Sequence, residues 1–104
     1  MYYSYVLLSS KSHTFYFGST KNLKHRLKLH NLGKVKSTKP GIPWELIWYG
    51  AFSTEKEARD FERYLKTGSG KAFTYKRLLS VALAKDFVRG RKGITKHNNP
   101  KPKV

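Results

Sequence analysis

Two short runs of aromatic and aliphatic residues near the N-terminus constrain the fold of this chain more than any other feature. The first run covers Tyr2–Ser9. The second, residues 14–18, alternates so that Phe15 and Phe17 face opposite to Tyr16. Because only a short polar segment separates the two runs, they predict a pair of strands joined as a β-hairpin.

The tyrosines of this hairpin are positioned to meet. Side chains alternate along a strand, so Tyr3, Tyr5 and Leu7 share one side of the first strand. At least one of these two tyrosines can therefore approach Tyr16 across the strand pair. The sequence does not fix the register of the two strands.

The helix predicted after the hairpin carries polar groups on its inward face. Spacing of i, i+3, i+4 and i+7 places four residues on that face: Leu23, Arg26, Leu27 and His30. Ser19 or Thr20 can cap this helix, and Gly33 can end it. Arg26 and His30 must be buried with partners or point into a cleft. A phenol, a guanidinium and an imidazole together in a basic protein indicate a site that handles phosphate.

Two contrasting segments follow this helix. Residues 33–43 contain three lysines, two glycines and two prolines, which predicts an exposed basic loop able to contact a phosphate backbone. Residues 45–52 are apolar enough to form the central strand of a small sheet, covered on both faces.

A second helix begins with a capping box formed by Thr54 and Glu57, and Gly68 and Gly70 are expected to end it. Its inward stripe contains Ala58, Phe61, Glu62 and Leu65. A last helix is predicted over residues 73–87, with an inward face made of Tyr75, Leu78, Leu79 and Ala82.

Glu62 is the anomaly among the acidic residues of this second helix. The chain has six acidic residues, and four of them lie here: Glu55, Glu57, Asp60 and Glu62. Three have ordinary roles, because Glu57 caps, Glu55 can pair with Arg59, and Asp60 is flanked by Lys56 and Arg63. Glu62 alone faces the sheet, so it either holds a hard cation or pairs with Lys66 at i+4. The spacing leaves both alternatives open.

Composition narrows the class of protein. A chain of 104 residues that is 38% hydrophobic has enough apolar residues for one modest core, so we expect a single domain. Its formal net charge of +16 favours a polyanionic partner, above all nucleic acid. With no cysteine, no signal-peptide pattern and no membrane-spanning run, we expect a cytoplasmic protein without a membrane partner. Residues 88–104 are basic and almost free of apolar residues, which predicts a flexible tail after a domain of residues 1–87.

Several ordered motifs together resemble the GIY-YIG nuclease domain. Tyr3-Ser4-Tyr5 and Tyr16-Phe17-Gly18 are separated by eleven residues from Tyr5 to Tyr16, and Arg26 and a late glutamate follow. Trp44-Glu45-Leu46 and Glu62-Arg63-Tyr64-Leu65-Lys66-Thr67-Gly68 are similar to small stand-alone members related to the incision subunit of bacterial nucleotide-excision repair. The resemblance covers about the first three quarters of the chain. It implies an α+β fold with a small three-stranded mixed sheet flanked by helices.

The resemblance also implies hydrolysis of a phosphodiester with a divalent metal, and it assigns a role to each matching residue. Tyr16 would activate the attacking water, and Tyr5 would position that group or the water. Arg26 would stabilise charge on the phosphate, and His30 would assist proton transfer. Glu62 would hold a single Mg²⁺ or Mn²⁺. A phenol has a usual pKa of about 10, so a nearby metal and the positive charge must favour its ionised form.

The chain departs from the name-giving motifs at three positions. Tyr3 and Ser4 stand where the first motif has glycine and isoleucine, and Phe17 replaces the isoleucine of the second. Some relatives have a lysine shortly after the second motif, where this chain has Ser19. Any cation that this lysine supplies must then come from another residue, such as Lys21.

The leading hypothesis is a metal-dependent endonuclease that cuts DNA, with single-stranded, branched or damaged DNA as possible substrates and no small-molecule cofactor. The competing hypothesis is a noncatalytic nucleic-acid-binding module on the same fold. In both, backbone contacts come from basic side chains. The candidates are Lys21, Lys34, Lys36, Lys39, Lys66 and Lys71. Repair, mobile-element biology and control of DNA uptake all remain open as pathways.

Overall fold

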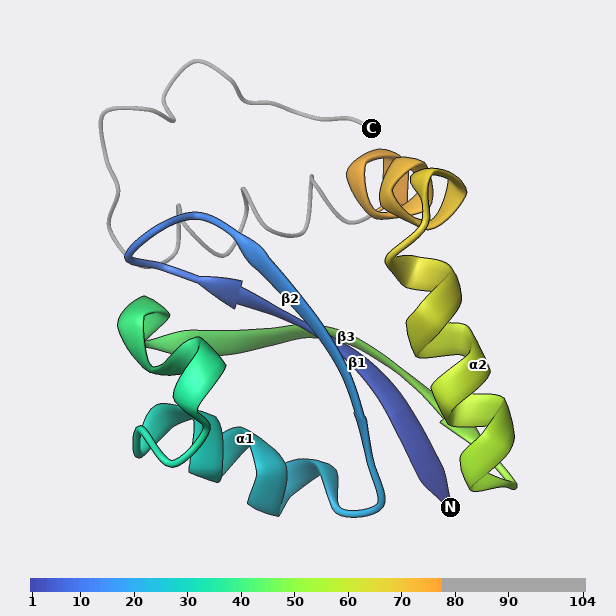
Figure 1. Ribbon diagram of the computed structural model, residues 1–104, viewed down its shortest axis with the longest axis horizontal. Helices are drawn as coiled ribbons and strands as arrows, with labels where there is room; N and C mark the ends of the chain where they lie inside the picture. Colours follow the sequence, from blue (N-terminus) through green and yellow to red (C-terminus); the bar gives the residue numbers. More distant parts are fainter. Residues whose placement is uncertain (78–104) are drawn as a thin grey trace.

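The computed structural model describes residues 1–77, which form a three-stranded sheet flanked by helices (Figure 1). The strands are β1 (Tyr2–Ser9), β2 (Phe15–Thr20) and β3 (Trp44–Phe52). The helices are α1 (Leu23–Asn31), the 3₁₀ helix η1 (Lys36–Gly41) and α2 (Glu55–Leu65). The predicted α+β fold is confirmed. The predicted domain of residues 1–87 extends beyond the described residues, and the predicted tail, 88–104, lies outside them.

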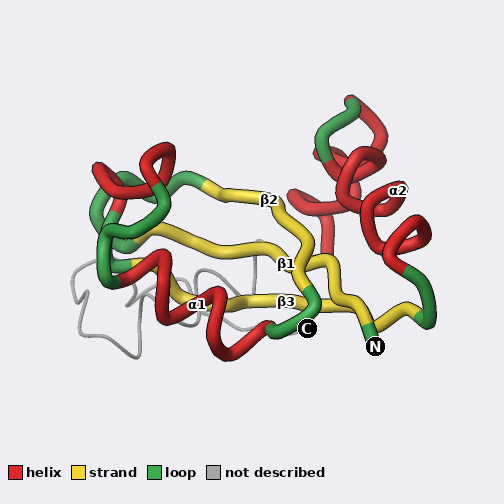
Figure 2. Tube along the Cα trace, turned by 60° about the horizontal axis from the view of Figure 1, so that its bottom comes forward, coloured by secondary structure: helices red, strands yellow, loops and turns green. Residues whose placement is uncertain are grey.

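The strand order is β2-β1-β3, so β1 is the central strand and both of its pairings are antiparallel (Figure 2). The sheet is therefore not mixed, because β2 and β3 run in the same direction but β1 lies between them. The hairpin is confirmed, and its register pairs Tyr5 with Gly18 and Leu7 with Tyr16. The prediction that residues 45–52 form the central strand is wrong, since β3 is at the edge of the sheet.

The two faces of the sheet carry separate apolar clusters. Tyr5, Leu7 and Trp44 are buried on the face that α1 covers. On the face that α2 covers, the buried residues are Val6, Leu8, Ile47 and Leu65. Between Val6 and Leu7 the register of β3 shifts by one residue, which places Ile47 and Trp48 on the same face. Because of this bulge, consecutive apolar residues of β3 pack on the same face. The sequence pattern was therefore mistaken for a strand buried on both faces.

Helix α1 has its N-cap two or three residues later than predicted. Its N-cap is Asn22, whose side-chain oxygen accepts a hydrogen bond of 3.0 Å from the backbone N–H of His25. Ser19 and Thr20 cannot cap because both still belong to β2. The predicted stop is confirmed, since Gly33 follows the C-cap with a φ of 76°. The predicted inward face is also confirmed, with His30 buried and its three companions half-buried.

The segment predicted to be an exposed basic loop is partly folded and partly buried. Residues of η1 pack beside α1, and Thr38 and Gly41 within it are buried. Lys34, Lys36 and Lys39 are exposed, as predicted. The composition of this segment correctly predicted that its lysines are exposed. It did not predict the 3₁₀ helix or the buried Thr38.

Helix α2 begins at the predicted capping box, with Thr54 and the side chain of Glu57 each accepting a hydrogen bond from the other residue's backbone N–H. It ends at Leu65, before the predicted glycines, and residues 68–77 form another helix. Gly70 lies inside that helix, where a Cβ would overlap the carbonyl of Tyr64. Tyr75 is 59% exposed, so its predicted inward position is wrong, and Leu78, Leu79 and Ala82 lie outside the described residues.

Candidate active site

The phenol of Tyr5 lies over Gly18, its partner on the edge strand β2. A Cβ placed on Gly18 would lie 2.5 Å from the Tyr5 hydroxyl oxygen and 2.6 Å from Cζ. The ring therefore crosses β2 at the one residue of this strand that has no side chain, and its hydroxyl reaches toward the outer edge of the sheet. This contact is a structural reason for the glycine of the second tyrosine motif.

A chain of buried hydrogen bonds holds the Tyr5 hydroxyl. The hydroxyl lies 2.9 Å from Nε2 of His30, and Nδ1 of His30 lies 2.7 Å from Oγ1 of Thr38. The Thr38 hydroxyl donates to the carbonyl of Val35 at 3.3 Å, so it accepts from Nδ1–H. Nε2 then accepts the hydrogen bond that the Tyr5 hydroxyl donates. Thr38 is a site residue that sequence reasoning missed, because nothing distinguishes it within a lysine-rich segment.

Burial sets the protonation states of this chain. Burial raises the pKa of Tyr5 to about 12, against a hydrogen bond from Arg26 that lowers it. Burial also lowers the pKa of His30 to about 4, with the positive charge of Arg26 acting in the same direction. At neutral pH, Tyr5 is therefore a neutral donor and His30 a neutral acceptor. The imidazole is fully buried, and both of its nitrogens are in hydrogen bonds, one to Tyr5 and one to Thr38.

Tyr16 and Arg26 complete the α1 side of the site. The ring of Tyr16 packs 5.0 Å from the His30 ring, 6.2 Å from Trp44 and 6.3 Å from Tyr5, measured between centroids. Arg26 is half-buried and acts on the Tyr5 phenol by hydrogen bond and charge. The predicted meeting of a phenol, a guanidinium and an imidazole is thus observed.

Glu62 reaches the same edge of β2 from the opposite face. Its Oε1 accepts a hydrogen bond of 2.6 Å from the hydroxyl of Ser19, the residue after Gly18, and its charge contributes to the raised pKa of Tyr5. Its Oε2 accepts from Nζ of Lys66 at 2.9 Å, so the predicted i, i+4 ion pair is also present. The cation beside the carboxylate is Lys66 rather than Lys21, whose Nζ lies 5.8 Å from the centre of the Tyr2 ring.

Ser4 anchors the turn of α2 that carries Glu62. Its buried hydroxyl donates to the carbonyl of Ala58 at 2.6 Å, one helical turn before Glu62. A buried hydroxyl needs such a partner, and the carbonyl of a helix can accept a second bond. This contact gives a structural reason for serine in the first tyrosine motif. Sequence reasoning missed it, because a serine between two tyrosines on an alternating strand gives no signal of burial.

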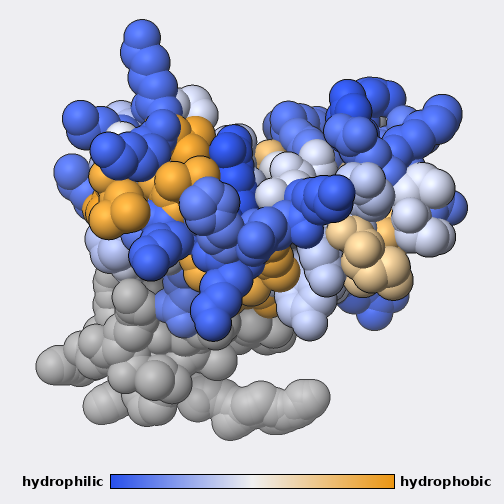
Figure 3. Space-filling model, turned by 90° about the horizontal axis from the view of Figure 1, so that it is seen from below, coloured by the Kyte–Doolittle hydropathy of each residue, from blue (hydrophilic) through white to orange (hydrophobic). Residues whose placement is uncertain are grey.

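The predicted nucleic-acid-binding lysines do not form a single cluster. Lys21 lines a recess beside α1, and Lys34, Lys36 and Lys39 lie at the other end of that helix. Lys66 pairs with Glu62, and Lys71 lines a different recess with Phe15 and Phe17. No acidic residue precedes Glu45, so the hairpin, α1 and η1 carry only positive side-chain charge. Figure 3 views the molecule from below, the side on which α1 lies in Figure 1, where hydrophilic side chains cover much of the surface.

Comparison with known proteins identifies the fold family. The family described as the GIY-YIG catalytic domain matches residues 1–76. This chain belongs to the GIY-YIG family. A UPF0213 protein of Bacillus licheniformis is 42% identical over 71 residues, covering 67% of this chain and 72% of that relative. UPF0213 protein YazA of Bacillus subtilis is 41% identical over 63 residues, and a UPF0213 protein of Streptococcus pneumoniae is 37% identical over 65. These two matches cover 60% and 62% of this chain and 64% and 65% of the relatives, just under two thirds.

Two kinds of feature are absent from the described part of this GIY-YIG domain: a cluster of metal ligands and a membrane-spanning helix. Within residues 1–77, no three His, Cys, Asp or Glu side chains are grouped closely enough to hold a metal ion by themselves. None of the helices described there has the length and apolar character to cross a bilayer. Among these residues, Glu62 is the carboxylate that reaches the edge of β2 beside Gly18.

Replacing Gly18 of this GIY-YIG domain by Ala is expected to destabilise it by about 1–3 kcal/mol. The new methyl group would overlap the Tyr5 phenol, which cannot move without breaking its bond to His30. Urea unfolding measures this change. The matched control is Gly68→Ala, since a Cβ there meets nothing within 4 Å and should change stability by less than about 0.5 kcal/mol. Equal stability of the two variants would contradict the packing of Tyr5 on Gly18.

The stability of this domain is expected to fall as the pH is lowered from 6.5 to 4. The pKa of His30 is about 4 in the folded state and 6.5 in the reference state, so the unfolded chain binds the proton more readily in this window. The loss attributable to His30 is at most about 3 kcal/mol. Urea unfolding at pH 7 and pH 4.5 should show a smaller drop for His30→Gln than for the wild type. His25→Gln, at an exposed position on the same helix, should keep the wild-type drop. An unchanged drop in His30→Gln would refute the assignment.

Proposed function

We propose that this chain is a divalent-metal-dependent endonuclease that hydrolyses DNA phosphodiester bonds. One observation carries the proposal: Glu62 is hydrogen-bonded to Ser19, the residue after Gly18, and the Tyr5 hydroxyl lies over Gly18, although the helix of Glu62 and the ring of Tyr5 are on opposite faces of the sheet. Membership of the GIY-YIG family supports phosphodiester hydrolysis as the chemistry of such a site.

Each requirement of the reaction has a candidate residue. Hydrolysis of a phosphodiester needs an activated water, positive charge on the nonbridging oxygens and a proton for the leaving oxygen. We assign the positive charge to Arg26, which is half-buried and free of an acidic neighbour on its own helix. We assign activation of the water to Tyr16, because the Tyr5 hydroxyl remains protonated and donates its hydrogen bond to His30.

Tyr5 and His30 act as positioning residues in this proposal. Tyr5 remains protonated at neutral pH, so its oxygen can orient Arg26 or the attacking water but cannot take up a proton. His30 fixes the phenol by accepting its hydrogen bond and is itself fixed by Thr38. The assistance to proton transfer that the family resemblance implies for His30 is thus indirect.

Glu62 is the proposed ligand for a single Mg²⁺ or Mn²⁺. Magnesium typically keeps several of its waters and binds through one or two carboxylates plus substrate phosphates, and a lone carboxylate beside a phosphate site fits that pattern. Such a cation would acidify a bound water and neutralise charge on the phosphate. Ser19 holds one carboxylate oxygen toward β2. Lys66 competes for the other oxygen, and its side chain is 54% exposed, so it can swing away.

Nonspecific backbone contacts would supply most of the affinity for DNA. Positive side chains without acidic ones lie in the hairpin turn, just after β2, on α1 and on η1, which fits a phosphate backbone and predicts strong weakening of binding by salt. We propose phosphate contacts for Lys21, Lys34, Lys36, Lys39, Lys66 and Lys71. DNA repair on single-stranded, branched or damaged DNA in the cytoplasm is the setting that we infer.

A noncatalytic DNA-binding module is the second candidate, and the ion pair between Glu62 and Lys66 favours it. That contact satisfies the carboxylate without any metal. The basic surface would serve binding equally well whether or not the site cuts. The two candidates differ in what they predict for a metal ion.

Incubation of the protein with labelled single-stranded, duplex and branched DNA, in Mg²⁺, Mn²⁺ or a chelator, separates these candidates. The nuclease proposal expects cleavage of at least one substrate with either metal and none with the chelator. Binding without cleavage of any substrate in either metal would favour the binding module.

A further inference from the structure

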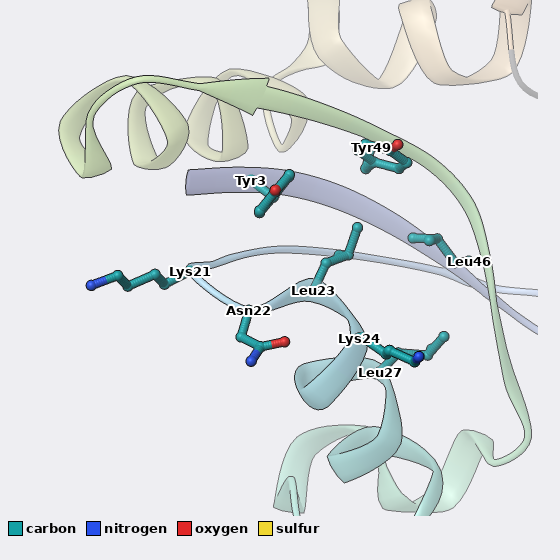
Figure 4. A pocket seen from close by; sticks show the side chains of 8 residues that line it. All are labelled: Tyr3, Lys21, Asn22, Leu23, Lys24, Leu27, Leu46 and Tyr49. Carbon is teal, nitrogen blue, oxygen red and sulfur yellow. The ribbon is translucent and has the colours of Figure 1, made fainter. Parts of the chain in front are cut away.

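The described surface has a recess beside α1 that the proposed chemistry does not use. It has a volume of about 480 Å³, within the range of about 300–1,000 Å³ that is usual for ligand pockets. Figure 4 shows its walls: tyrosines from β1 and β3 on one side and the first turns of α1 on the other. It is lined by Tyr3, Lys21, Asn22, Leu23, Lys24, Leu27, Leu46 and Tyr49.

Two tyrosines give this recess an unusual aromatic wall. Tyr3 stands where the name-giving motif of the family has glycine, and its ring meets that of Tyr49 edge-on at 5.9 Å between centroids. Tyr49 is 53% exposed, although it occupies a strand beside the core. The pair of rings lines a recess together, and paired aromatic side chains with polar tips are typical of binding surfaces.

The charge around the recess selects the kind of ligand. Lys21 and Lys24 are exposed side chains that line it, although Nζ of Lys21 lies over the Tyr2 ring in this structure, and the first turn of α1 contains no acidic residue. Acidic residues are the ones that normally stabilise a helix N-terminus, so basic residues alone there favour an anionic ligand. The floor is apolar, with Leu23, Leu27 and Leu46. The aromatic and apolar walls suit a nucleotide base, and the lysines beside them suit its phosphate.

The position of the recess relates it to the proposed active site. Tyr3 and Tyr5 lie two residues apart on the same face of β1, about 7 Å along a strand. Leu23 and Arg26 lie one turn apart on α1. A nucleotide held in the recess would therefore be near the nucleotide whose phosphate meets Arg26.

We propose that this recess binds one unpaired base of a single-stranded DNA segment, stacked on Tyr49 and Tyr3, with the adjoining phosphates on Lys21 and Lys24. The proposal rests on the proposed function for its choice of DNA and deepens it by naming the substrate class. Bases in a duplex are stacked on one another and cannot enter a recess in the protein surface, whereas unpaired bases stack readily on exposed aromatic rings.

Binding of labelled single-stranded and duplex DNA of equal length, followed by fluorescence anisotropy in chelator so that nothing is cut, tests this proposal. Tyr49→Ala should weaken single-strand binding about tenfold and change duplex binding less than about twofold, because only the stacking contact is lost. Tyr49→Phe keeps the ring and should bind both as the wild type does. Tyr64→Ala removes another exposed tyrosine, on α2, and should change neither.

Single-strand binding that Tyr49→Ala does not weaken overturns the proposal, and so does an equal weakening for both kinds of DNA. Because the assay contains no metal, its outcome is independent of cleavage. A protein that stacks single strands on Tyr49 but never cuts DNA would refute the nuclease and leave the recess assigned.

Discussion

Replacing Glu62 by Gln is expected to reduce metal-dependent cleavage by about 100-fold or more. The amide keeps the shape of the side chain and can still accept the hydrogen bond from Ser19, so the local structure should persist. It has no charge with which to hold a divalent cation. DNA binding should be unchanged or slightly tighter, because the variant loses one negative charge. Single-turnover cleavage and anisotropy on the same labelled DNA measure the two effects.

The matched control is Glu55→Gln on the same helix. It removes the ion pair between Glu55 and Arg59, whose side chains are 61% and 55% exposed, and such surface pairs contribute only about 0.2–1 kcal/mol. This variant should cut at the wild-type rate. Cleavage by Glu62→Gln at the wild-type rate would rule out the carboxylate as the metal ligand.

Replacing Tyr16 by Phe is expected to lower the cleavage rate by about 100-fold without loss of fold. The ring packs against His30 and Trp44, and phenylalanine preserves those contacts. Only the hydroxyl that we assign to activation of the water is removed. Urea unfolding should therefore match the wild type within about 1 kcal/mol, whereas single-turnover cleavage should drop sharply.

Tyr5→Phe provides the contrast that separates the two tyrosines. It leaves Nε2 of the buried His30 without its donor, and an unpaired buried polar group costs about 1–3 kcal/mol. This variant should lose stability as well as cleavage. If Tyr16→Phe cuts normally and Tyr5→Phe is as stable as the wild type, the assigned roles are wrong.

The elements in which apolar residues recur with a regular spacing were predictable from the sequence. Alternation gave the hairpin, and the i, i+3, i+4, i+7 spacing placed Arg26 and His30 on the inward face of α1. The strand order was not predictable from hydrophobicity. Central β1 contains two buried serines, whose hydroxyls are satisfied by the carbonyls of Ala58 and Gly41, so its burial does not appear in its composition.

Residue spacing and the family motifs identified the candidate residues of the site, but they did not show how these residues meet. Sequence placed Glu62 toward the sheet without revealing that it reaches the edge strand at Ser19. The Tyr5 phenol reaches the same edge from the other face because Gly18 has no side chain to block it. Thr38 could not be found, because its contact with His30 joins a lysine-rich turn to a helix through tertiary packing alone.

The central claim is that Tyr16 on one face of the sheet and Glu62 from the other act as one catalytic site. A double-mutant cycle tests it most directly: single-turnover cleavage by the wild type, Glu62→Gln, Tyr16→Phe and the double variant, in saturating Mg²⁺ with the protein in excess over DNA. Residues that act as a unit lose little more together than singly, so the double variant should cut within about threefold of the slower single variant. A double variant whose loss equals the product of the two single losses would contradict the claim.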